Sequence, residues 1–372
     1  MDVYEKLVKA KAEDKLPQIT VSLRIDGPGS TLDMRAWQHI FYQHRDPDLE
    51  DAKSDWSKDI PRTVGISIDV GTDIVASPIE KGMLCVESWD YDYVRLARKD
   101  EITHNKENYL LLIMNIFGLD GIKFTIRNHD SKLKSAGMGG SAAVTTAVAL
   151  FANKLTGSKY NNDQIIGMAS MIEEDFGVSL TGTQEQSCVV YGGVKDYIWF
   201  PYGTPGKGNF FGSSIRQTLL EEEDYPELKK RLDVYFCLER FSADVNAIWR
   251  EELKNVNGFK LQRKFMELAY EYREAIRNKD WKAVEAPVEE YRKIREELCE
   301  HYMSPSAHQI NEVCKKHGAV CFPLGGGGGS VMVYSAEPEI LLKVRQELDG
   351  KFKLIDYNIS ETGHVFKNME SF

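Results

Sequence analysis

Residues 133–155 read LKSAGMGGSAAVTTAVALFANKL, a turn rich in glycine that runs directly into a long row of small residues. A β-branched run precedes this stretch, and the alanine-rich part that follows the turn carries no charge over most of its length. The pattern predicts a strand, a loop that carries Gly137, Gly139 and Gly140, and a helix that begins near Ser141. The small side chains of such a helix allow close packing against its neighbours.

A loop and helix in this order form a suitable anion site. Unpaired backbone N–H groups and the positive end of the helix dipole point at one place, and glycines let the main chain approach an anion closely. The motif is not the Walker pattern, because no Gly-Lys-Ser/Thr follows, and it is not GxGxxG. On this stretch alone, a helix packed near a sheet, with glycines needed only for space, is the alternative explanation.

The composition is that of a soluble cytoplasmic protein. The chain has 372 residues, 42% of them hydrophobic, and its net charge of -10 argues against a nucleic-acid or anionic-membrane partner. No apolar run reaches the roughly 18 residues that span a bilayer, and the N-terminus is too polar for a signal peptide. The six cysteines are scattered without a CxxC pair, which predicts a reducing compartment.

The first half of the chain alternates strands with helices. β-branched, alternating runs predict an antiparallel sheet in the opening third, interrupted by a polar insertion at 42–61. Asn162 or Asp163 is expected to cap the second of the later helices. The expected strands are 19–26, 62–79, 83–97, 121–130 and 194–201, and the expected helices are 106–119, the run after Ser141, and 161–177.

The second half begins with a glycine-rich turn at 202–214 and then changes character. Long charged amphipathic helices are expected between 243 and 316, and two strands flank the glycine tract Gly325–Gly329. Further strands are expected at 231–241 and 352–360. The fold class is therefore predicted as α+β with two lobes, one over residues 1–228 and the other over 229–372.

Four segments resemble the motifs of one superfamily, the GHMP small-molecule kinases. SAGMGGSAA at 135–143 resembles the phosphate loop GLGSSAA, and PLGGGGGSVMVY at 323–334 resembles the motif GAGGGGF. LRIDGPGSTLD at 23–33 is similar to the substrate motif RIDFAGGWSD of the heptose 7-phosphate kinase and fucokinase-like branch. GTQEQSCVVYGGVKDYIWF at 182–200 is similar to GKQDQYAAAFGG of that branch. The four segments follow the family order and cover nearly the whole chain.

The resemblance implies a fold and an activity. The fold would be the two-lobed GHMP fold, with a nucleotide-binding N-terminal lobe and a ferredoxin-like C-terminal lobe. The activity would be ATP-dependent phosphorylation of a hydroxyl on a sugar or sugar phosphate, with ATP and Mg²⁺ as cofactors and a homodimer allowed. Two alternatives stay open: a kinase of a non-sugar alcohol, and a non-catalytic regulator that binds nucleotide or sugar.

The resemblance also assigns the nucleotide site. Ser141 and Glu173 fall where the family holds Mg²⁺, and magnesium favours oxygen ligands beside phosphate. From local sequence, Ser141 is equally explained as a helix cap, and Glu174 or Asp175 could be confused with Glu173. The residues that would cradle the phosphates of ATP are Gly137, Met138, Gly139, Gly140, Ser141, Ala142 and Ala143.

The acceptor site would lie between the two lobes. Glu185 falls at the position of the family's catalytic base, and the other catalytic residue would be Ser141. Arg24 could hold a substrate phosphate or form a structural ion pair, and Glu185 could pair instead with a cation such as Lys195. The residues expected to bind substrate are Arg24, Asp26, Asp33, Gly326 and Gly327.

Several positions depart from the family pattern. Glu185 stands where the heptose kinase and galactokinase branches carry aspartate, Gly140 replaces the first serine of the phosphate loop, and Leu133 replaces a common proline. Cys321 falls near the position of a common lysine, and residues 27–32 differ from the usual substrate motif. The altered substrate motif leaves the identity of the acceptor open.

Overall fold

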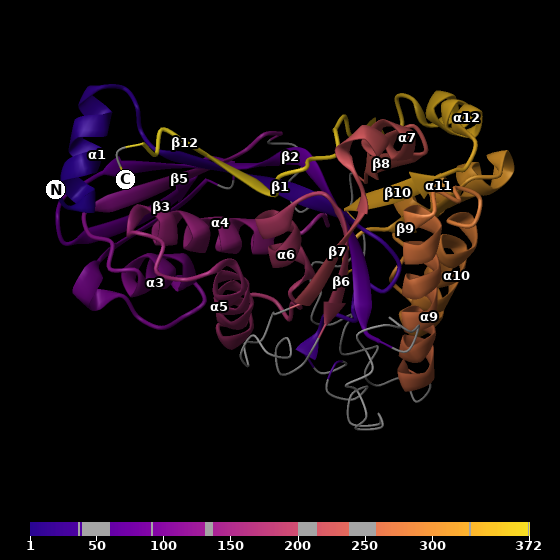
Figure 1. Cartoon of the computed structure of the whole chain (residues 1–372), viewed down its shortest axis with the longest axis horizontal. Coiled ribbons are helices and arrows are strands. Elements are labelled where there is room, and N and C mark those ends of the chain that lie inside the picture. The colour runs from indigo at the N-terminus through magenta and orange to yellow at the C-terminus, as the bar shows by residue number, and fades with distance from the viewer. Residues whose placement is uncertain are drawn as a thin grey trace.

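Figure 1 shows the computed structural model of the chain. The structure describes residues 1–35, 38, 60–90, 92–130, 137–199, 214–237, 258–326, 329–370 and 372. Most of the polar insertion at 42–61, nearly all of the glycine-rich turn at 202–214, and Gly327 lie outside the described residues. The predictions made for them are therefore left as predictions.

One large sheet forms the N-terminal part of the fold. Its strands follow the order β12-β1-β2-β5-β3-β4, and β6 pairs with both β2 and β7. All pairs are antiparallel except β3 with β5, which is parallel, so the predicted antiparallel sheet is correct for every other pair. The strands are β1 Gln18–Asp26, β2 Arg62–Pro78, β3 Met83–Ser88, β4 Tyr93–Arg98, β5 Ile122–Asn128, β6 Val194–Trp199, β7 Ser214–Leu220 and β12 His364–Lys367.

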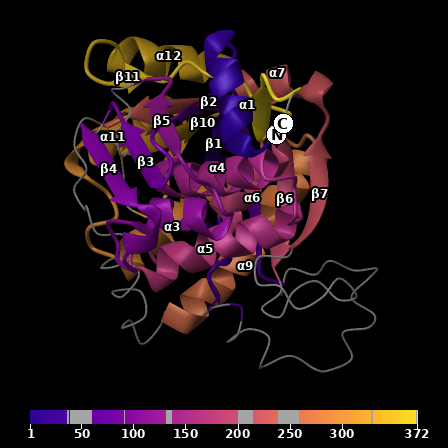
Figure 2. The same cartoon turned by 90° about the vertical axis from the view of Figure 1, so that its left-hand side faces the viewer.

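Four helices, α3, α4, α5 and α6, gather on one face of this sheet (Figures 1 and 2). The central helix is α4, which contacts β1 and β2 as well as the other three helices. Its small side chains are buried along most of its length, which explains the uncharged sequence found there. The helices of this lobe are α1 Val3–Ala12, α3 Tyr109–Ile116, α4 Gly140–Leu155, α5 Asn162–Asp175, α6 Gln184–Tyr191 and α7 Tyr225–Lys229.

The cap of α5 differs from the prediction. Asn161, rather than Asn162 or Asp163, is the N-cap: its Oδ1 accepts from the Gln164 backbone N–H at 3.0 Å. The Gln164 side chain in turn accepts from the Asn161 backbone N–H, which completes a capping box. Asp163 is engaged elsewhere, because Tyr191 and Arg216 both donate to its Oδ1.

The second sheet has the order β11-β8-β10-β9, and all of its pairs are antiparallel. Along the chain, one strand, helices, two strands, a helix and a last strand follow one another, which is the ferredoxin-like arrangement that the resemblance implied. The strands are β8 Leu232–Phe236, β9 Val320–Pro323, β10 Ser330–Tyr334 and β11 Lys353–Leu354, and the helices are α9 Gly258–Arg277, α10 Glu285–Leu298, α11 Pro305–His317 and α12 Pro338–Leu348.

The end of the chain leaves the second lobe and returns to the first. Strand β12 pairs antiparallel with β1, with Val21 opposite His364 and Gln18 opposite Lys367. The two termini lie close together beside α1 (Figures 1 and 2), where the Asn368 side chain donates to the Leu16 carbonyl at 3.0 Å. This strand was not predicted from the sequence, and the lobe boundary at residues 228 and 229 stays a prediction.

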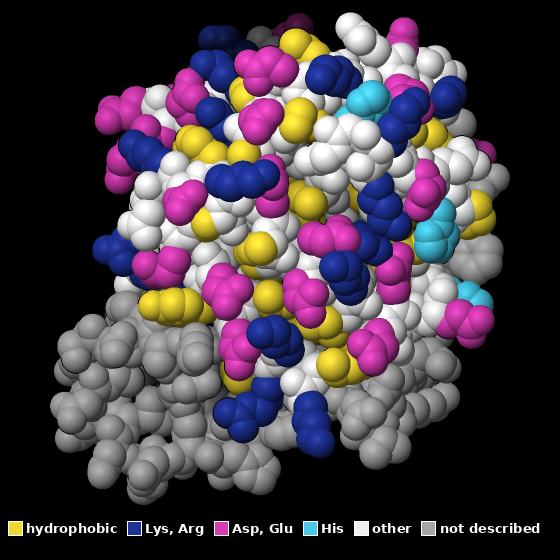
Figure 3. All heavy atoms as spheres, turned by 90° about the vertical axis from the view of Figure 1, so that its right-hand side faces the viewer, with side chains coloured by type: hydrophobic (Ala, Val, Ile, Leu, Met, Phe, Trp, Pro, Cys, Tyr) yellow, Lys and Arg dark blue, Asp and Glu magenta, His cyan; other side chains and the backbone are white. Residues whose placement is uncertain are grey.

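The surface of the second lobe carries both charge signs. Figure 3 shows lysine and arginine side chains interspersed with aspartate and glutamate over this face. Among the described residues, no helix is both long and apolar enough to cross a membrane.

Candidate active site

The glycine loop and the first turn of α4 form the floor of the site. Gly137 and Gly139 have φ values of 74° and 78°, and Gly139 is the N-cap of the helix. These backbone angles favour glycine, because a side chain there would be strained. A Cβ atom on Gly139 would also lie 2.6 Å from Cγ of Glu185. The glycine therefore lets the phosphate loop pack directly against the predicted base.

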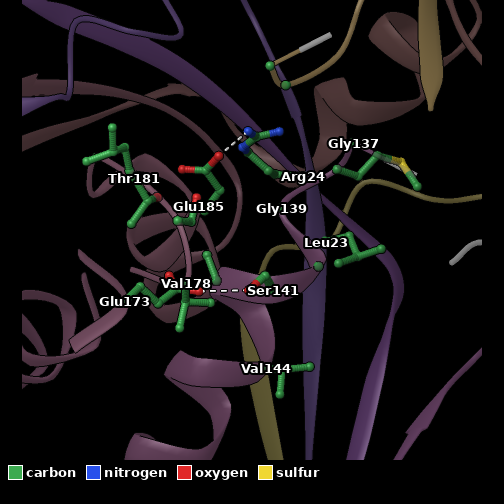
Figure 4. A pocket seen from close by; sticks show the side chains of 18 of the residues that line it. Leu23, Arg24, Gly137, Gly139, Ser141, Val144, Glu173, Val178, Thr181 and Glu185 are labelled. Carbon is green, nitrogen blue, oxygen red and sulfur yellow. Dashed lines mark hydrogen bonds and ion pairs between the residues drawn. The ribbon is translucent and has the colours of Figure 1, made fainter. Parts of the chain in front are cut away.

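The predicted metal ligands Ser141 and Glu173 meet beside this loop (Figure 4). The Ser141 hydroxyl donates to Oε1 of Glu173 at 2.9 Å, and Thr145 donates to the same oxygen at 3.1 Å. Gln186 donates to the other carboxylate oxygen at 3.2 Å. Burial raises the pKa of Glu173 to about 7, and the hydrogen bonds from Ser141 and Thr145 oppose that shift. The neighbouring Glu174 instead pairs with Arg35 at 3.6 Å.

Arg24 forms an ion pair with the predicted base, Glu185 (Figure 4). The other side of its guanidinium lies 3.0 Å from Oδ1 of Asp26. Arg24 and Asp26 are both buried, whereas the Glu185 side chain retains 20% exposure. Of the two roles expected for Arg24, the structure shows the ion pair, and the cation beside Glu185 is Arg24 rather than Lys195.

Asp33 lies at the N-terminus of α6, next to the same carboxylate. Its Oδ2 accepts from the Gln184 backbone N–H at 2.8 Å, and its Oδ1 is buried without a hydrogen-bond partner among the described residues. Gly182 makes room for this carboxyl, because a Cβ there would lie 2.0 Å from Oδ2. Burial, and then the charge of Glu185, raise the pKa of Asp33 to about 8.

The glycine tract of the second lobe closes the site from the other side. The Gly325 N–H donates to Oδ2 of Asp26 at 3.4 Å. Gly325 has a φ of 63°, and a Cβ there would lie 2.6 Å from the Gly137 carbonyl oxygen. The third glycine motif thus abuts the phosphate loop.

These residues line one cavity of about 990 Å³ at the junction of the two lobes. Every predicted site residue except two lines it: Ala143 is buried beneath the loop, and Gly327 lies outside the described residues. Its lining includes Ser88, Tyr93, Lys106 and Asn128, and also Arg295, Gly326 and the residues Ser30 and Thr31 of the predicted substrate motif. The cavity can accommodate two small ligands beside the phosphate loop.

The chemistry of the cavity fits a magnesium–phosphate complex. The Ser141 hydroxyl and the Glu173 carboxylate are hard oxygen donors, and Mg²⁺ in such sites takes few protein ligands beside phosphate oxygens and waters. The described residues contain no group of three or more His, Cys, Asp or Glu side chains that could hold a metal ion by themselves. A metal here would therefore depend on the phosphates of a bound nucleotide.

Several residues of the site were not named from the sequence. Gln184 and Gln186 flank Glu185 and connect it to Asp33 and Glu173, respectively. Thr145, one turn after Ser141, holds Glu173. The segment QEQ at 184–186 carries a polar first helical turn, which could have indicated these two contacts. The role of Arg295, which enters from α10, has no signal in any of the four motifs.

The comparisons with known proteins identify the domain that contains most of these residues. The pattern of the GHMP kinases N terminal domain matches residues 107–193, which include the phosphate loop, Glu173 and Glu185. Residues 107–193 are a GHMP kinase N-terminal domain. This match places residues 107–193 in a family of small-molecule kinases. No curated protein matches the sequence.

Solved structures share the GHMP fold over nearly the full chain. A D-glycero-D-manno-heptose 1-phosphate kinase from Bacteroides thetaiotaomicron is 13% identical, with a TM-score of 0.68, covering 94% of this chain and 98% of that one. A galactokinase from Lactococcus lactis, complexed with galactose, is 13% identical with a TM-score of 0.66 and covers 98% of each chain. The mevalonate kinase from Methanococcus jannaschii is 14% identical, with a TM-score of 0.63, covering 92% and 98%. Identities this low establish the fold alone.

Proposed function

We propose that the protein transfers the γ-phosphoryl group of ATP to a hydroxyl of a small metabolite, a sugar or sugar phosphate. The observation that carries the proposal is the direct packing of Glu185 against Gly139 of the phosphate loop. A phosphoryl group held by this loop would lie next to a carboxylate that can receive a proton. The sugar kinases among the structural neighbours support the choice of acceptor.

The phosphates of ATP would bind to the loop from Gly137 to Ala143. Phosphoryl transfer needs positioning and charge stabilisation more than covalent chemistry. The N-terminus of α4 supplies backbone N–H groups and a partial positive charge. Ser141 and Glu173 would hold Mg²⁺, which neutralises charge on the β- and γ-phosphate oxygens when bound.

Glu185 would orient the acceptor hydroxyl and take its proton. In a loose transition state this proton leaves late, so the carboxylate accepts it as charge develops on the attacking oxygen. The ion pair with Arg24 orients the Glu185 carboxylate, and the ion pair with Asp26 orients the Arg24 guanidinium. The Oδ1 atom of Asp33, which has no hydrogen-bond partner among the described residues, would accept a hydrogen bond from a hydroxyl of the substrate. When the carboxyl is protonated, it could instead donate one.

We further propose a cytoplasmic location for the protein. All six cysteines are buried, and their scattered positions without a CxxC pair support a reducing cytoplasm. The partner is a small molecule, and a homodimer stays a prediction. A non-catalytic regulator is the weaker candidate, because a protein that only binds nucleotide has no need for Glu185 beside the loop.

A substrate screen tests the proposal. Release of ADP from ATP and Mg²⁺ is measured with sugars, sugar phosphates, polyols and hydroxy amino acids as acceptors. We expect substrate-dependent ADP release with a member of the first two groups. ADP release with only a polyol or a hydroxy amino acid would show that the acceptor is an alcohol other than a sugar. Tight MgATP binding without release for any acceptor would support the regulator instead.

Two neighbouring glycines provide a matched test of the phosphate loop. Gly139→Ala should weaken MgATP binding at least about tenfold, because the new Cβ strains the loop and displaces Glu185. Gly140→Ala is the control, since a Cβ at Gly140 meets nothing within 4 Å and the family carries serine there. Isothermal titration with MgATP measures both. A folded Gly139→Ala protein with unchanged affinity would remove the loop from the nucleotide site.

A further inference from the structure

The acceptor end of the cavity contains a buried arginine that the motifs do not predict. Arg295 is 1% exposed, yet it lines the cavity together with Ser30, Thr31 and Gly326. From this position we infer that the acceptor carries an anionic group, a phosphate or a carboxylate, which Arg295 binds. The inference rests on the proposed kinase function and specifies its substrate class.

Arg24 is the arginine that was expected to hold a substrate phosphate. Its guanidinium lies between two carboxylates, those of Asp26 and Glu185. A phosphate placed there would be repelled by both carboxylates and would separate Glu185 from its partner. Among the described residues that line the cavity, the cations are Arg24, Lys106 and Arg295. An anionic acceptor therefore has to be held by another cation than Arg24.

The other two cations, Lys106 and Arg295, come from different lobes. Lys106 belongs to the segment before α3, in the N-terminal lobe, near Tyr93 and Ser88. Arg295 lies on α10 of the second lobe, one helical turn after Tyr291. The Tyr291 hydroxyl is 2.6 Å from Oγ of Ser30, which belongs to the predicted substrate motif. Among the described residues that line the cavity, Arg295 is thus the cation at the acceptor end.

The guanidinium of Arg295 stacks on an aromatic ring of the second lobe. It lies 4.7 Å from the centroid of the Tyr302 ring. The Tyr302 hydroxyl donates to the Pro323 carbonyl at 2.7 Å, and Pro323 directly precedes the glycine tract. A guanidinium has five donors in a planar fork, so it can hold a carboxylate or phosphate by two bonds while it stays stacked on a ring. A charge fixed in a buried site also interacts more strongly than one in water.

Matched acceptor pairs test the inference with the wild-type protein. The assay compares ADP release for a sugar and its phosphate monoester, and for an alcohol and the corresponding hydroxy acid. We expect the anionic member of the productive pair to show at least about tenfold higher kcat/KM, as one charge-assisted contact allows. The phosphate and carboxylate pairs distinguish the two sources of the anion. Equal or better turnover of the neutral members would overturn the inference and leave the kinase function intact.

Variants then assign the preference to Arg295. Arg295→Gln should remove most of the preference while MgATP affinity stays near wild type, and Arg295→Lys should retain part of it. Lys293→Gln on the exposed side of α10 removes the same charge and should change nothing. Inorganic phosphate should compete with the acceptor in the wild type and much less in Arg295→Gln. An unchanged preference in a folded Arg295→Gln protein would exclude this residue. Absence of both MgATP binding and ADP release would instead contradict the kinase function.

Discussion

The carboxyl groups around α6 have unequal affinities for protons because their surroundings differ. Asp33 is buried and faces the charge of Glu185, which raises its pKa to about 8, whereas Asp26 contacts a guanidinium that opposes its upward shift. Both Asp33 and Glu173 therefore titrate near neutral pH. Their protonation should couple both the activity and the stability of the protein to pH.

The stability of the fold should depend on the protonation of Asp33. Its folded pKa of about 8 exceeds the ordinary value of 3.8, so the folded state binds the proton more tightly. The stabilisation is present below about pH 4 and is lost as pH rises toward 8, by at most about 1.4 kcal/mol per pH unit. Urea titrations of wild type and Asp33→Asn between pH 5 and 8 measure this. We expect a shallower decline in the variant, and parallel curves would contradict the assignment.

Glu185 is the residue on which the proposed chemistry depends most. Glu185→Gln keeps the size of the side chain and its contact with Arg24 but cannot accept a proton. We expect kcat to fall about a hundredfold or more, with MgATP affinity nearly unchanged. Steady-state kinetics and nucleotide titration separate the two effects. Near-normal turnover would mean that positioning and Mg²⁺ suffice without a base.

The proposed magnesium ligands have a natural control one residue away. Ser141→Ala and Glu173→Gln should each raise the Mg²⁺ concentration needed for half-maximal MgATP binding. Glu174→Gln should not, because Glu174 points toward Arg35. Nucleotide titrations at several Mg²⁺ concentrations give the comparison. An effect from Glu174 and none from Glu173 would place the metal ligand one residue later than proposed.

The sequence predicted the residues of the site better than their contacts. Glu185, Ser141 and Glu173 were named because motif positions carry chemical roles. The ion pair between Glu185 and Arg24 was not predicted. These residues are 161 positions apart in sequence and meet only through the hydrogen bonding of β1 with β2 and the packing of α6. Arg295 lies on a helix whose sequence is amphipathic and charged throughout, so a single functional arginine has no local signal there.

At the level of elements, the helix caps decide where α5 begins. Three consecutive residues, Asn161, Asn162 and Asp163, are all suitable N-caps by residue type, but only Asn161 is followed three residues later by a glutamine, a signal that the prediction did not use. The structure selects Asn161 because Gln164 lies three residues later and completes the capping box. Strands with strong alternation were predicted well, whereas the short strand β12 was missed because its four residues lie far from the sheet in sequence.

Alanine substitutions at adjacent asparagines test this cap. Asn161→Ala should lower the free energy of unfolding by about 1 kcal/mol, because the N–H of Gln164 loses its acceptor. Asn162→Ala should have little effect, since this side chain is exposed in the first turn of α5. Urea denaturation measures both variants. A larger loss at Asn162 would show that the helix starts one residue later.

At the level of the whole molecule, the two lobes are not independent segments of sequence. The second lobe is continuous from β8 to β11, and the chain then returns to add β12 to the first sheet. An ion pair between Lys353 and Asp130 also links β11 to the segment after β5. The change of pattern along the chain predicted two lobes, and the resemblance implied that the glycine tract of the second lobe lies near the substrate. The resemblance did not predict the returning strand, because no motif lies beyond Tyr334.

The returning strand should stabilise the first lobe more than the second. β12 covers the edge of β1, and its Phe366 ring lies 6.4 Å from the Phe151 ring of α4. Removal of residues 364–372 would expose that edge and part of the helix packing. We therefore expect faster hydrogen exchange in β1 and α4, while the strands β8 and β10 keep their protection.

A point variant shows whether the faster hydrogen exchange comes from lost packing of Phe366 or from the shortened chain. Phe366→Ala should reproduce much of the loosening of α4, and Val365→Ala should not, because Val365 is 45% exposed on the other face of the strand. Since β1 carries Arg24 and Asp26 at its end, loosening should also weaken the ion pair with Glu185 and lower kcat in Phe366→Ala. Unchanged exchange in β1 after truncation, or equal loosening of the second sheet, would show that the last strand does not act through the first lobe.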